Sequence, residues 1–169
     1  MNNITTDKLI RTSKATLMLF FCIFGLLMMH SNFTDYTANH EYVSHILSMD
    51  TIDDAGRYSH RAITSPMLHH RIYWIIMTLE VTYTVFCLIG AWSLFRNINS
   101  SRQAFHEAKK YSIIGLLIAI FVYYVCLQVI GVEWFNMDLS EKWNYKDWAR
   151  HIVDFIFALL IYVTMRIER

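Results

Sequence analysis

Four long apolar runs dominate this sequence and restrict the folds that it can adopt. They lie at about residues 15–32, 72–95, 111–130 and 150–166, and 55% of the chain is hydrophobic, more than is usual for a soluble domain. A helix needs roughly 20 mainly apolar residues to cross a bilayer, and it satisfies its own backbone hydrogen bonds in lipid. We therefore predict an all-α integral membrane protein, a four-helix bundle that forms one domain over residues 1–169.

Lysine and arginine are unevenly divided among the segments that connect these runs. Nine of the 15 lie before the first run, between the second and third, or after the fourth, beside only three acidic residues. Residues 33–71 and 131–150 hold the other six, together with nine acidic residues. Because basic connections stay in the cytoplasm, both termini are predicted to be cytoplasmic. The loop 33–71 and the hairpin 131–149 are then extracytoplasmic. No small-x-small cleavage pattern follows the first run, so we expect it to be a retained span.

The first extracytoplasmic loop contains the amphipathic stretch NHEYVSHILSMD. Its apolar residues Tyr42, Val43, Ile46, Leu47 and Met49 fall on one helical stripe. We expect a short amphipathic helix that lies across the outer mouth of the bundle. Further along the loop, proline follows serine at positions 65 and 66, a pattern typical of the first helical position. The second helix is therefore predicted to begin at the proline.

Histidines gather on the predicted outer side, where seven of the eight lie. His45 and Met49 are four residues apart on the amphipathic stretch, Asp50 follows, and Glu133 stands where the third run ends. Imidazole and thioether suit copper, whereas imidazole with carboxylate suits zinc. His45, Met49, Asp50 and Glu133 are therefore candidate ligands for copper or zinc. The alternative is that these residues are ordinary interface and helix residues that bind no metal.

Glu80 lies nine residues into the second run, at a depth near the middle of the membrane. An ionisable side chain there is costly and indicates function by default. Tyr123 and Tyr124 of the third run lie at a similar depth, and Thr78, Thr82 and Thr84 are close in sequence. Two interpretations stay open: a proton or cation relay, or a protonated acid that holds the helices together through hydrogen bonds to tyrosine or threonine.

The outer hairpin is rich in tryptophan and in polar residues. Trp134 and Trp143 fit the aromatic belt of a membrane interface. Asn144 precedes the fourth run by a distance suited to capping a helix start. These residues either anchor the hairpin or line the wall of an outer pocket.

The sequence as a whole resembles the bacterial "predicted small integral membrane protein" family, domain of unknown function 2165. The stretch NHEYVSHILSMD, the glutamate in the second run and the hairpin GVEWFNMDLSEKWN carry the resemblance. The matching residues are Asn39, Val43, His45, Met49, Asp50, Glu80, Glu133, Trp134, Phe135, Met137, Trp143 and Asn144. Val132 and Asp138 depart from the family's hairpin, which has glycine and tryptophan at these places. The resemblance implies a bacterial inner-membrane location and no particular activity.

Three functions are compatible with these observations. The first is a non-enzymatic accessory or binding protein with an outward-facing polar pocket for a metal, a lipid headgroup or a protein partner. The residues of that pocket would be His45, Asp50, Glu80, Glu133, Trp134, Trp143 and Asn144. The second is proton- or cation-coupled transport through Glu80, and the third is immunity against a pore-forming toxin.

The sequence lacks the common catalytic motifs, so we expect no enzyme activity. Its net charge of +1 gives no sign of nucleic-acid binding. The expected partners are the bilayer and either another membrane protein or further copies of the chain.

Overall fold

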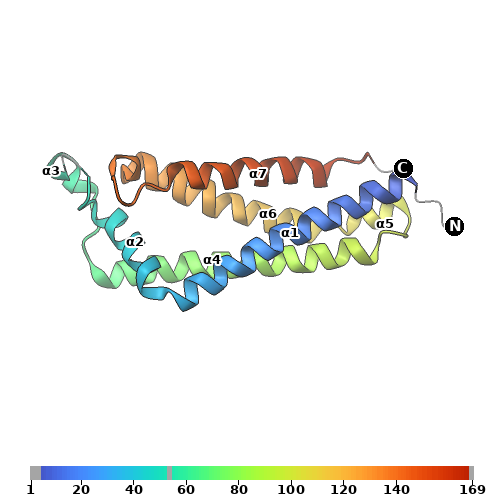
Figure 1. Ribbon diagram of the computed structural model, residues 1–169, viewed down its shortest axis with the longest axis horizontal. Coiled ribbons are helices and arrows are strands. Elements are labelled where there is room, and N and C mark those ends of the chain that lie inside the picture. The colour runs from blue at the N-terminus through green and yellow to red at the C-terminus, as the bar shows by residue number, and fades with distance from the viewer. Residues whose placement is uncertain (1–4, 53–54, 168–169) are drawn as a thin grey trace.

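The computed structural model describes residues 5–52 and 55–167, which are helical with short connections. The only strand-like pairing among them is an isolated bridge between Ile52 and Ser140. In chain order the elements are α1 (Thr6–Thr34), α2 (Tyr36–Ser48), α3 (Ala55–Tyr58), the 3-10 turn η1 (Ser59–Arg61), α4 (Pro66–Arg96), α5 (Arg102–Glu107), α6 (Lys110–Ile120), the π-helical η2 (Phe121–Trp134), the 3-10 turn η3 (Met137–Leu139) and α7 (Lys146–Thr164). Both described chain ends lie at the end of the molecule that carries α5, which we call the inner end (Figure 1). The opposite end, with α2 and α3, is the outer end.

The first three predicted spans coincide with helices that are long and apolar enough to cross a membrane. These are α1, α4 and the continuous helical stretch Arg102–Trp134. About a third of each apolar stretch is buried within the protein, 33%, 33% and 28% in chain order. The remaining apolar surface needs lipid or another apolar partner to cover it. The helices extend beyond the predicted spans at both ends, because their polar terminal turns stand outside the apolar runs.

The predicted fourth span differs from the other three. Helix α7 lies lengthwise beside α6 and η2 (Figure 1), but it is not among the helices apolar enough to be identified as a span. Its first nine residues contain Asp147, Arg150 and Asp154, which oppose insertion into hydrocarbon. A membrane protein with three candidate spans is therefore established, while the count of four stays a prediction. Arg169, which contributes to the predicted charge asymmetry, lies outside the described residues.

Two glycines bring the backbones of α4 and α6 into direct contact. A Cβ atom added to Gly90 would lie 2.8 Å from the Cα of Ser112, and one added to Gly115 would lie 2.9 Å from the backbone nitrogen of Cys87. Backbone atoms cannot move aside without shifting a whole helix. Small residues at such crossings allow the close approach on which helix association in membranes depends.

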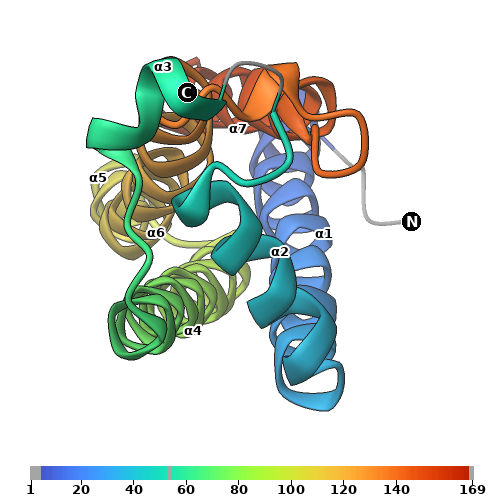
Figure 2. The ribbon, with the colours of Figure 1, turned by 90° about the vertical axis from the view of Figure 1, so that its left-hand side faces the viewer.

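The outer end is closed by the predicted amphipathic helix, which forms as α2 and crosses in front of α1 and α4 (Figure 2). The side-chain amide of Asn39 donates hydrogen bonds to the carbonyls of Ser31 and Asp35, at 3.2 and 3.3 Å, and so fastens α2 to the end of α1. The apolar side of α2 packs against the hairpin in a small core formed by Leu47, Met49, Ile52 and Phe135. Helix α2 ends at Ser48, so Met49 lies just past the expected helical stripe, in a left-handed conformation with φ 53°.

The inner end is held together by two buried lysines. The ammonium groups of Lys14 in α1 and Lys109 before α6 both donate to the backbone carbonyl of Met165, at 2.5 and 2.9 Å. This carbonyl follows the last turn of α7, where helix carbonyl groups lack partners within the helix. Positive charge is favourable at this end of a helix, so the two lysines fix the end of α7 against α1 and α6.

Replacing Gly115 with alanine should lower the free energy of unfolding by about 1–3 kcal/mol, because the added methyl group overpacks the contact between α4 and α6. The better helix propensity of alanine, about 1 kcal/mol, offsets only part of this loss. Unfolding of the purified protein in detergent, followed by circular dichroism, measures the change. Gly56→Ala is the matched control, since no described residue beyond its own chain neighbours comes within 4 Å of its added Cβ. Equal stability of the two variants would contradict the close contact.

Candidate functional site

Glu80 lies halfway along α4 and faces the interior of the protein. It is the fifteenth of the 31 residues of α4, and its side chain is only 4% exposed. Buried residues of α4 recur at Tyr73, Met77, Glu80, Thr84 and Cys87, and steps of three or four residues place side chains on one helix face. The position of Glu80 on this face directs its carboxyl group inward, away from lipid.

Neutral polar side chains from two other helices hold the Glu80 carboxyl group. The side-chain amide of Asn32, near the end of α1, donates a hydrogen bond to Glu80, and the Tyr123 hydroxyl in η2 forms another. The hydroxyl oxygens of Tyr123 and Tyr83 are 3.1 Å apart. The Tyr73 hydroxyl donates to the backbone and side-chain oxygens of Asn32, at 3.1 and 3.3 Å. We call these five buried residues the Glu80 network.

No basic side chain compensates Glu80 among the residues that the structure describes. The ion pairs at the outer end involve His45 and Lys146, and neither reaches into the Glu80 network. An isolated ionised carboxyl group in apolar surroundings is very costly. Such a group is therefore expected to carry a proton or to meet a cation in the course of its function.

The structure places Tyr123 against the Glu80 carboxyl group, as the sequence led us to expect. Thr84 contacts only the backbone carbonyl of Glu80, at 2.8 Å, and the other expected neighbours lie elsewhere. Tyr124 is 44% exposed on the outside of η2. The three threonines near Glu80 donate to backbone carbonyls one turn back within α4, as helical threonines commonly do; they are Thr78, Thr82 and Thr84. Asn32 was not predicted as a partner, although an amide near the end of an apolar run is a signal that could have identified it.

A cluster of two histidines and a tyrosine lies between the Glu80 network and the outer end. His40 of α2 and His70 of α4 stack ring on ring, with centroids 3.9 Å apart and ring planes inclined by 16°. The Tyr36 hydroxyl is 2.9 Å from Nδ1 of His70. The ring of Tyr73 contacts Tyr36 and His40 edge-on, with centroid distances of 5.0 and 5.8 Å. This outer cluster of Tyr36, His40 and His70 thus joins the Glu80 network at Tyr73.

The surroundings of His40 disfavour its protonated form. Burial lowers the pKa of His40 below its ordinary value, and the nearby charges of His70 and His69 lower the pKa further, because desolvation and like charges both disfavour the imidazolium form. The Nε2 atom of His40 is buried and has no hydrogen-bond partner within the described ranges. A neutral His40 is therefore the form that fits the stack.

Three of the predicted pocket residues meet on the outer surface around His45. Its Nδ1 atom is 2.8 Å from Oδ1 of Asp50, and its ring stacks on Trp143 with centroids 5.1 Å apart and planes inclined by 15°. Its other nitrogen, Nε2, is 3.6 Å from Glu41, one turn back in α2. The carboxylate and the indole hold the imidazole in one orientation on this surface.

Asn144 lies farther along the hairpin and serves the start of α7. Its side-chain amide donates to the carbonyl of Asp138 at 3.2 Å, and its side-chain oxygen accepts from the backbone nitrogen of Lys146 at 3.1 Å. The helix begins at Lys146, and Tyr145 occupies the N-cap position. Asn144, the residue before the N-cap, therefore binds the first N–H group of the helix, a role that the N-cap side chain usually has. This contact gives Asn144 a structural role within the hairpin.

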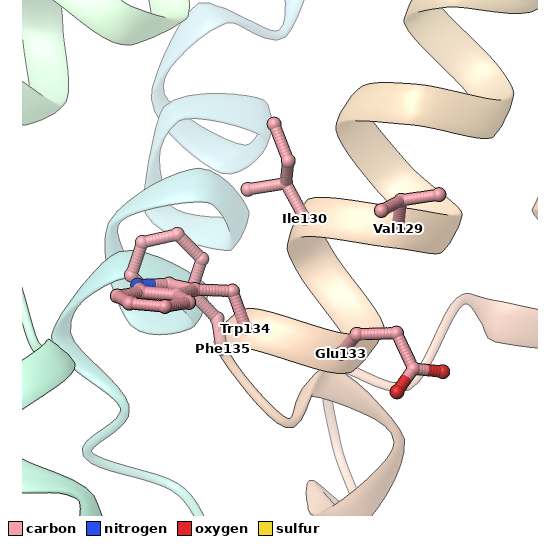
Figure 3. Close-up of a pocket in the computed structure, with 5 residues that line it drawn as sticks. All are labelled: Val129, Ile130, Glu133, Trp134 and Phe135. Atoms are coloured by element: carbon pink, nitrogen blue, oxygen red, sulfur yellow. The ribbon is translucent and has the colours of Figure 1, made fainter.

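Glu133 and Trp134 lie on another side of the hairpin. With Val129, Ile130 and Phe135 they line a mostly apolar cavity of about 480 Å³. Figure 3 shows the Glu133 carboxylate pointing away from the rings of Trp134 and Phe135. Because Phe135 packs into the small core under α2, the helical register of η2 turns Glu133 away from that side.

The predicted metal ligands are therefore not gathered around one point. His45 and Asp50 are in contact, Met49 is buried in the small core, and Glu133 lines the cavity beside Val129 and Ile130. Within residues 5–52 and 55–167, no group of three or more histidine, cysteine, aspartate or glutamate residues is arranged to hold a metal ion. Copper or zinc binding stays a prediction from the sequence. Of the four predicted ligands, His45 and Asp50 are the two that lie next to each other.

Comparison with known proteins identifies the family of the chain. The family described as "Predicted small integral membrane protein (DUF2165)" matches residues 10–166, a range that extends from α1 to the end of α7. No curated protein and no solved structure matches the chain. Since the family match covers nearly the whole sequence, including the helices that hold the Glu80 network and the outer cluster, the protein belongs to the DUF2165 family of small integral membrane proteins.

Proposed function

We propose that this is a non-catalytic protein of the bacterial inner membrane that takes up and releases a proton at Glu80 from the outer side. The observation that supports this most strongly is the buried Glu80 carboxyl group, which is held by neutral hydrogen-bonding groups. Among the described residues it has no basic partner. A carboxyl group so placed is suited to reversible protonation.

The Glu80 network can accommodate both protonation states of the carboxyl group. An ionised Glu80 accepts hydrogen bonds from the Asn32 amide and the Tyr123 hydroxyl. A protonated Glu80 carries an O–H group that needs an acceptor, and a hydroxyl oxygen can either donate or accept. Reversing the bonds through Tyr123 and Tyr83, which are 3.1 Å apart, supplies that acceptor. The proton can therefore bind and leave without a change in helix packing.

The distribution of polar groups favours access from the outer end. On that side Asn32 leads to Tyr73, and Tyr73 contacts the histidine stack. On the inner side of Tyr83 and Tyr123, the described core is mainly apolar, with Met18, Phe21 and Leu116 among its buried members. Its buried polar residues include Thr84, Ser112 and the two lysines of the inner end. A site open to one side suits a proton-binding accessory protein. Transport, the alternative use of Glu80, would require this apolar layer to open.

The surface around His45 supports a second candidate function, the binding of a metal, a lipid headgroup or a protein partner. The supporting observation is the fixed orientation of the imidazole between Asp50 and Trp143. This surface is separate from the Glu80 network, so the two functions can be tested independently. Immunity against a pore-forming toxin stays a prediction, since no contact in the site bears on it.

Glu80→Gln should abolish the buried proton site while keeping the shape of the side chain. Difference infrared spectra of the protein in lipid, recorded between about pH 5 and 8, detect protonation of a carboxyl group. We expect the wild type to show the carboxylic-acid signal and Glu80→Gln to lose it, because the amide does not titrate. Glu141→Gln, which changes an exposed carboxylate, is the matched control and should keep the signal.

An unchanged signal in Glu80→Gln would exclude Glu80 as the proton site. Proton flux into liposomes that contain the protein separates binding from transport. Flux no greater than in empty liposomes is expected from a site open to one side, and flux that depends on Glu80 would favour the transport alternative instead.

Acid should destabilise the protein through His40. Its pKa is lowered in the folded state, so the unfolded state binds more protons, and the stabilising contribution is lost as pH falls below the unfolded value of about 6.5. The groups that face His40 are His70, His69, Tyr36 and Tyr73. His40→Phe keeps a stacked ring and should reduce the loss of melting temperature on acidification.

Melting temperatures measured at about pH 7.5 and 5.5 test the effect of His40. His60→Phe, at an exposed position in η1, is the control and should retain the acid sensitivity of the wild type. Identical acid sensitivity in His40→Phe and the wild type would show that the histidine stack does not respond to pH.

Access from the outer side requires the orientation that the charge asymmetry predicts. His60→Cys places a thiol in the exposed loop before α4, and Asn99→Cys places one in the exposed connection after α4. In intact cells whose outer membrane is made permeable, a membrane-impermeant maleimide should label His60→Cys alone. Asn99→Cys should react only after the inner membrane is opened. The reverse labelling pattern would invert the orientation and contradict outer-side access.

A further inference from the structure

A polar pocket at the inner end is independent of the Glu80 network. Arg102, Gln103 and His106 of α5 line it together with Arg166, which follows α7, and the cavity measures about 170 Å³. The sequence predicted a basic inner end but gave no sign that two arginines from segments 64 residues apart would share one pocket. The close approach of α5 to the end of α7 produces this arrangement.

Hydrogen bonds hold both arginines in place. The Arg166 Nε atom donates to Nε2 of His106 at 3.0 Å, and Nη2 of Arg102 donates to the backbone carbonyl of Arg166 at 3.4 Å. Each guanidinium group has five N–H donors, and these contacts use one from each. The remaining donors can bind an oxyanion without reorganisation of the two side chains.

The positive charge of the pocket is not neutralised by the part of the chain that the structure describes. Neither Arg102 nor Arg166 forms an ion pair with a carboxylate there. Glu107, five residues after Arg102 in α5, accepts a hydrogen bond from the Gln103 amide at 2.7 Å. Two neighbouring guanidinium groups repel each other, so an anion bound between them would be favourable.

The surrounding residues place the pocket at the level of a membrane interface. The Arg96 guanidinium lies over the exposed ring of Trp92 at 6.0 Å, and the Lys110 ammonium lies over the ring of Tyr111 at 4.8 Å. Aromatic and basic residues at the ends of apolar helices sit among lipid headgroups. The pocket between α5 and the end of α7 lies at the same end of these helices (Figure 1).

We propose that this pocket binds the phosphate of an anionic lipid headgroup in the leaflet at the inner end. The planar guanidinium fork matches the oxygens of a phosphate group. Basic pockets between membrane helices on the cytoplasmic side are suited to anionic headgroups. A soluble phosphate has the same chemistry, but the position of the pocket beside the interfacial residues favours the lipid.

Native mass spectrometry of the full-length protein in detergent, titrated with phosphatidylglycerol or phosphatidylcholine, tests this assignment. We expect retention of phosphatidylglycerol in preference to phosphatidylcholine. The double variant Arg102→Gln, Arg166→Gln should weaken phosphatidylglycerol binding about tenfold or more, since it removes both guanidinium groups that would contact the phosphate, and a hydrogen bond to a charged group contributes on the order of one tenfold factor. The double variant Arg96→Gln, Lys110→Gln removes the same charge from the same end outside the pocket, and it should bind as the wild type does.

Several outcomes would overturn the proposal. Equal retention of the two lipids, or equal loss in both double variants, would show that the pocket has no role in selection. Inorganic phosphate that binds to the wild type but not to Arg102→Gln, Arg166→Gln, without preferential lipid retention, would assign the pocket to a soluble anion. Circular dichroism spectra and melting temperatures verify that both double variants are folded, which we expect because exposed arginine contacts add little stability.

Discussion

The hydrogen bond between Asn32 and Glu80 is the contact on which the arrangement of the outer half depends. It joins α1 to α4 across 48 positions of sequence, in an interior where a carboxyl group without partners would be very costly. Tyr123 supplies a second bond from η2. These contacts require α1, α4 and η2 to keep one mutual register, because a shift of a single helix turn would leave the carboxyl group without its partners.

The inner half is held by two other kinds of contact, the hydrogen bonds of Lys14 and Lys109 to the Met165 carbonyl and close packing between α4 and α6. Gly90 and Gly115 let α4 and α6 approach until their backbones touch, and dispersion attraction along this contact needs no polar group. The helices are therefore closely packed where the interior is apolar and joined by hydrogen bonds where it is polar. The hydrogen bonds that lead from the proton site proposed at Glu80 through Asn32 to Tyr73 accordingly run toward the outer end. It also makes the anion pocket at the inner end a separate feature that draws on Arg102 and Arg166.

Sequence reasoning identified Glu80 because a lone carboxylate inside an apolar run is conspicuous, and it named Tyr123 because the depth of a residue in a helix can be counted. Sequence reasoning missed Asn32, because a polar residue at the end of an apolar run can equally well be an ordinary polar helix terminus or a buried hydrogen-bond partner. The expectation that Glu133 would join His45 and Asp50 depended on the rotation of η2 about its axis. That rotation follows from the packing of Phe135 under α2, which no local pattern encodes.

Taken alone, the sequence determined that the protein is helical and resides in a membrane, that α2 forms in the first loop, and that α4 begins at Pro66. Each of these properties follows from local periodicity, apolar length or backbone restriction. The tertiary structure decided which side chains meet: Asn32 with Glu80, His40 with His70, and Arg102 with Arg166. Such pairs depend on the relative rotation and depth of helices far apart in the chain, and those quantities are set by close packing between helices rather than by the pattern within any one of them.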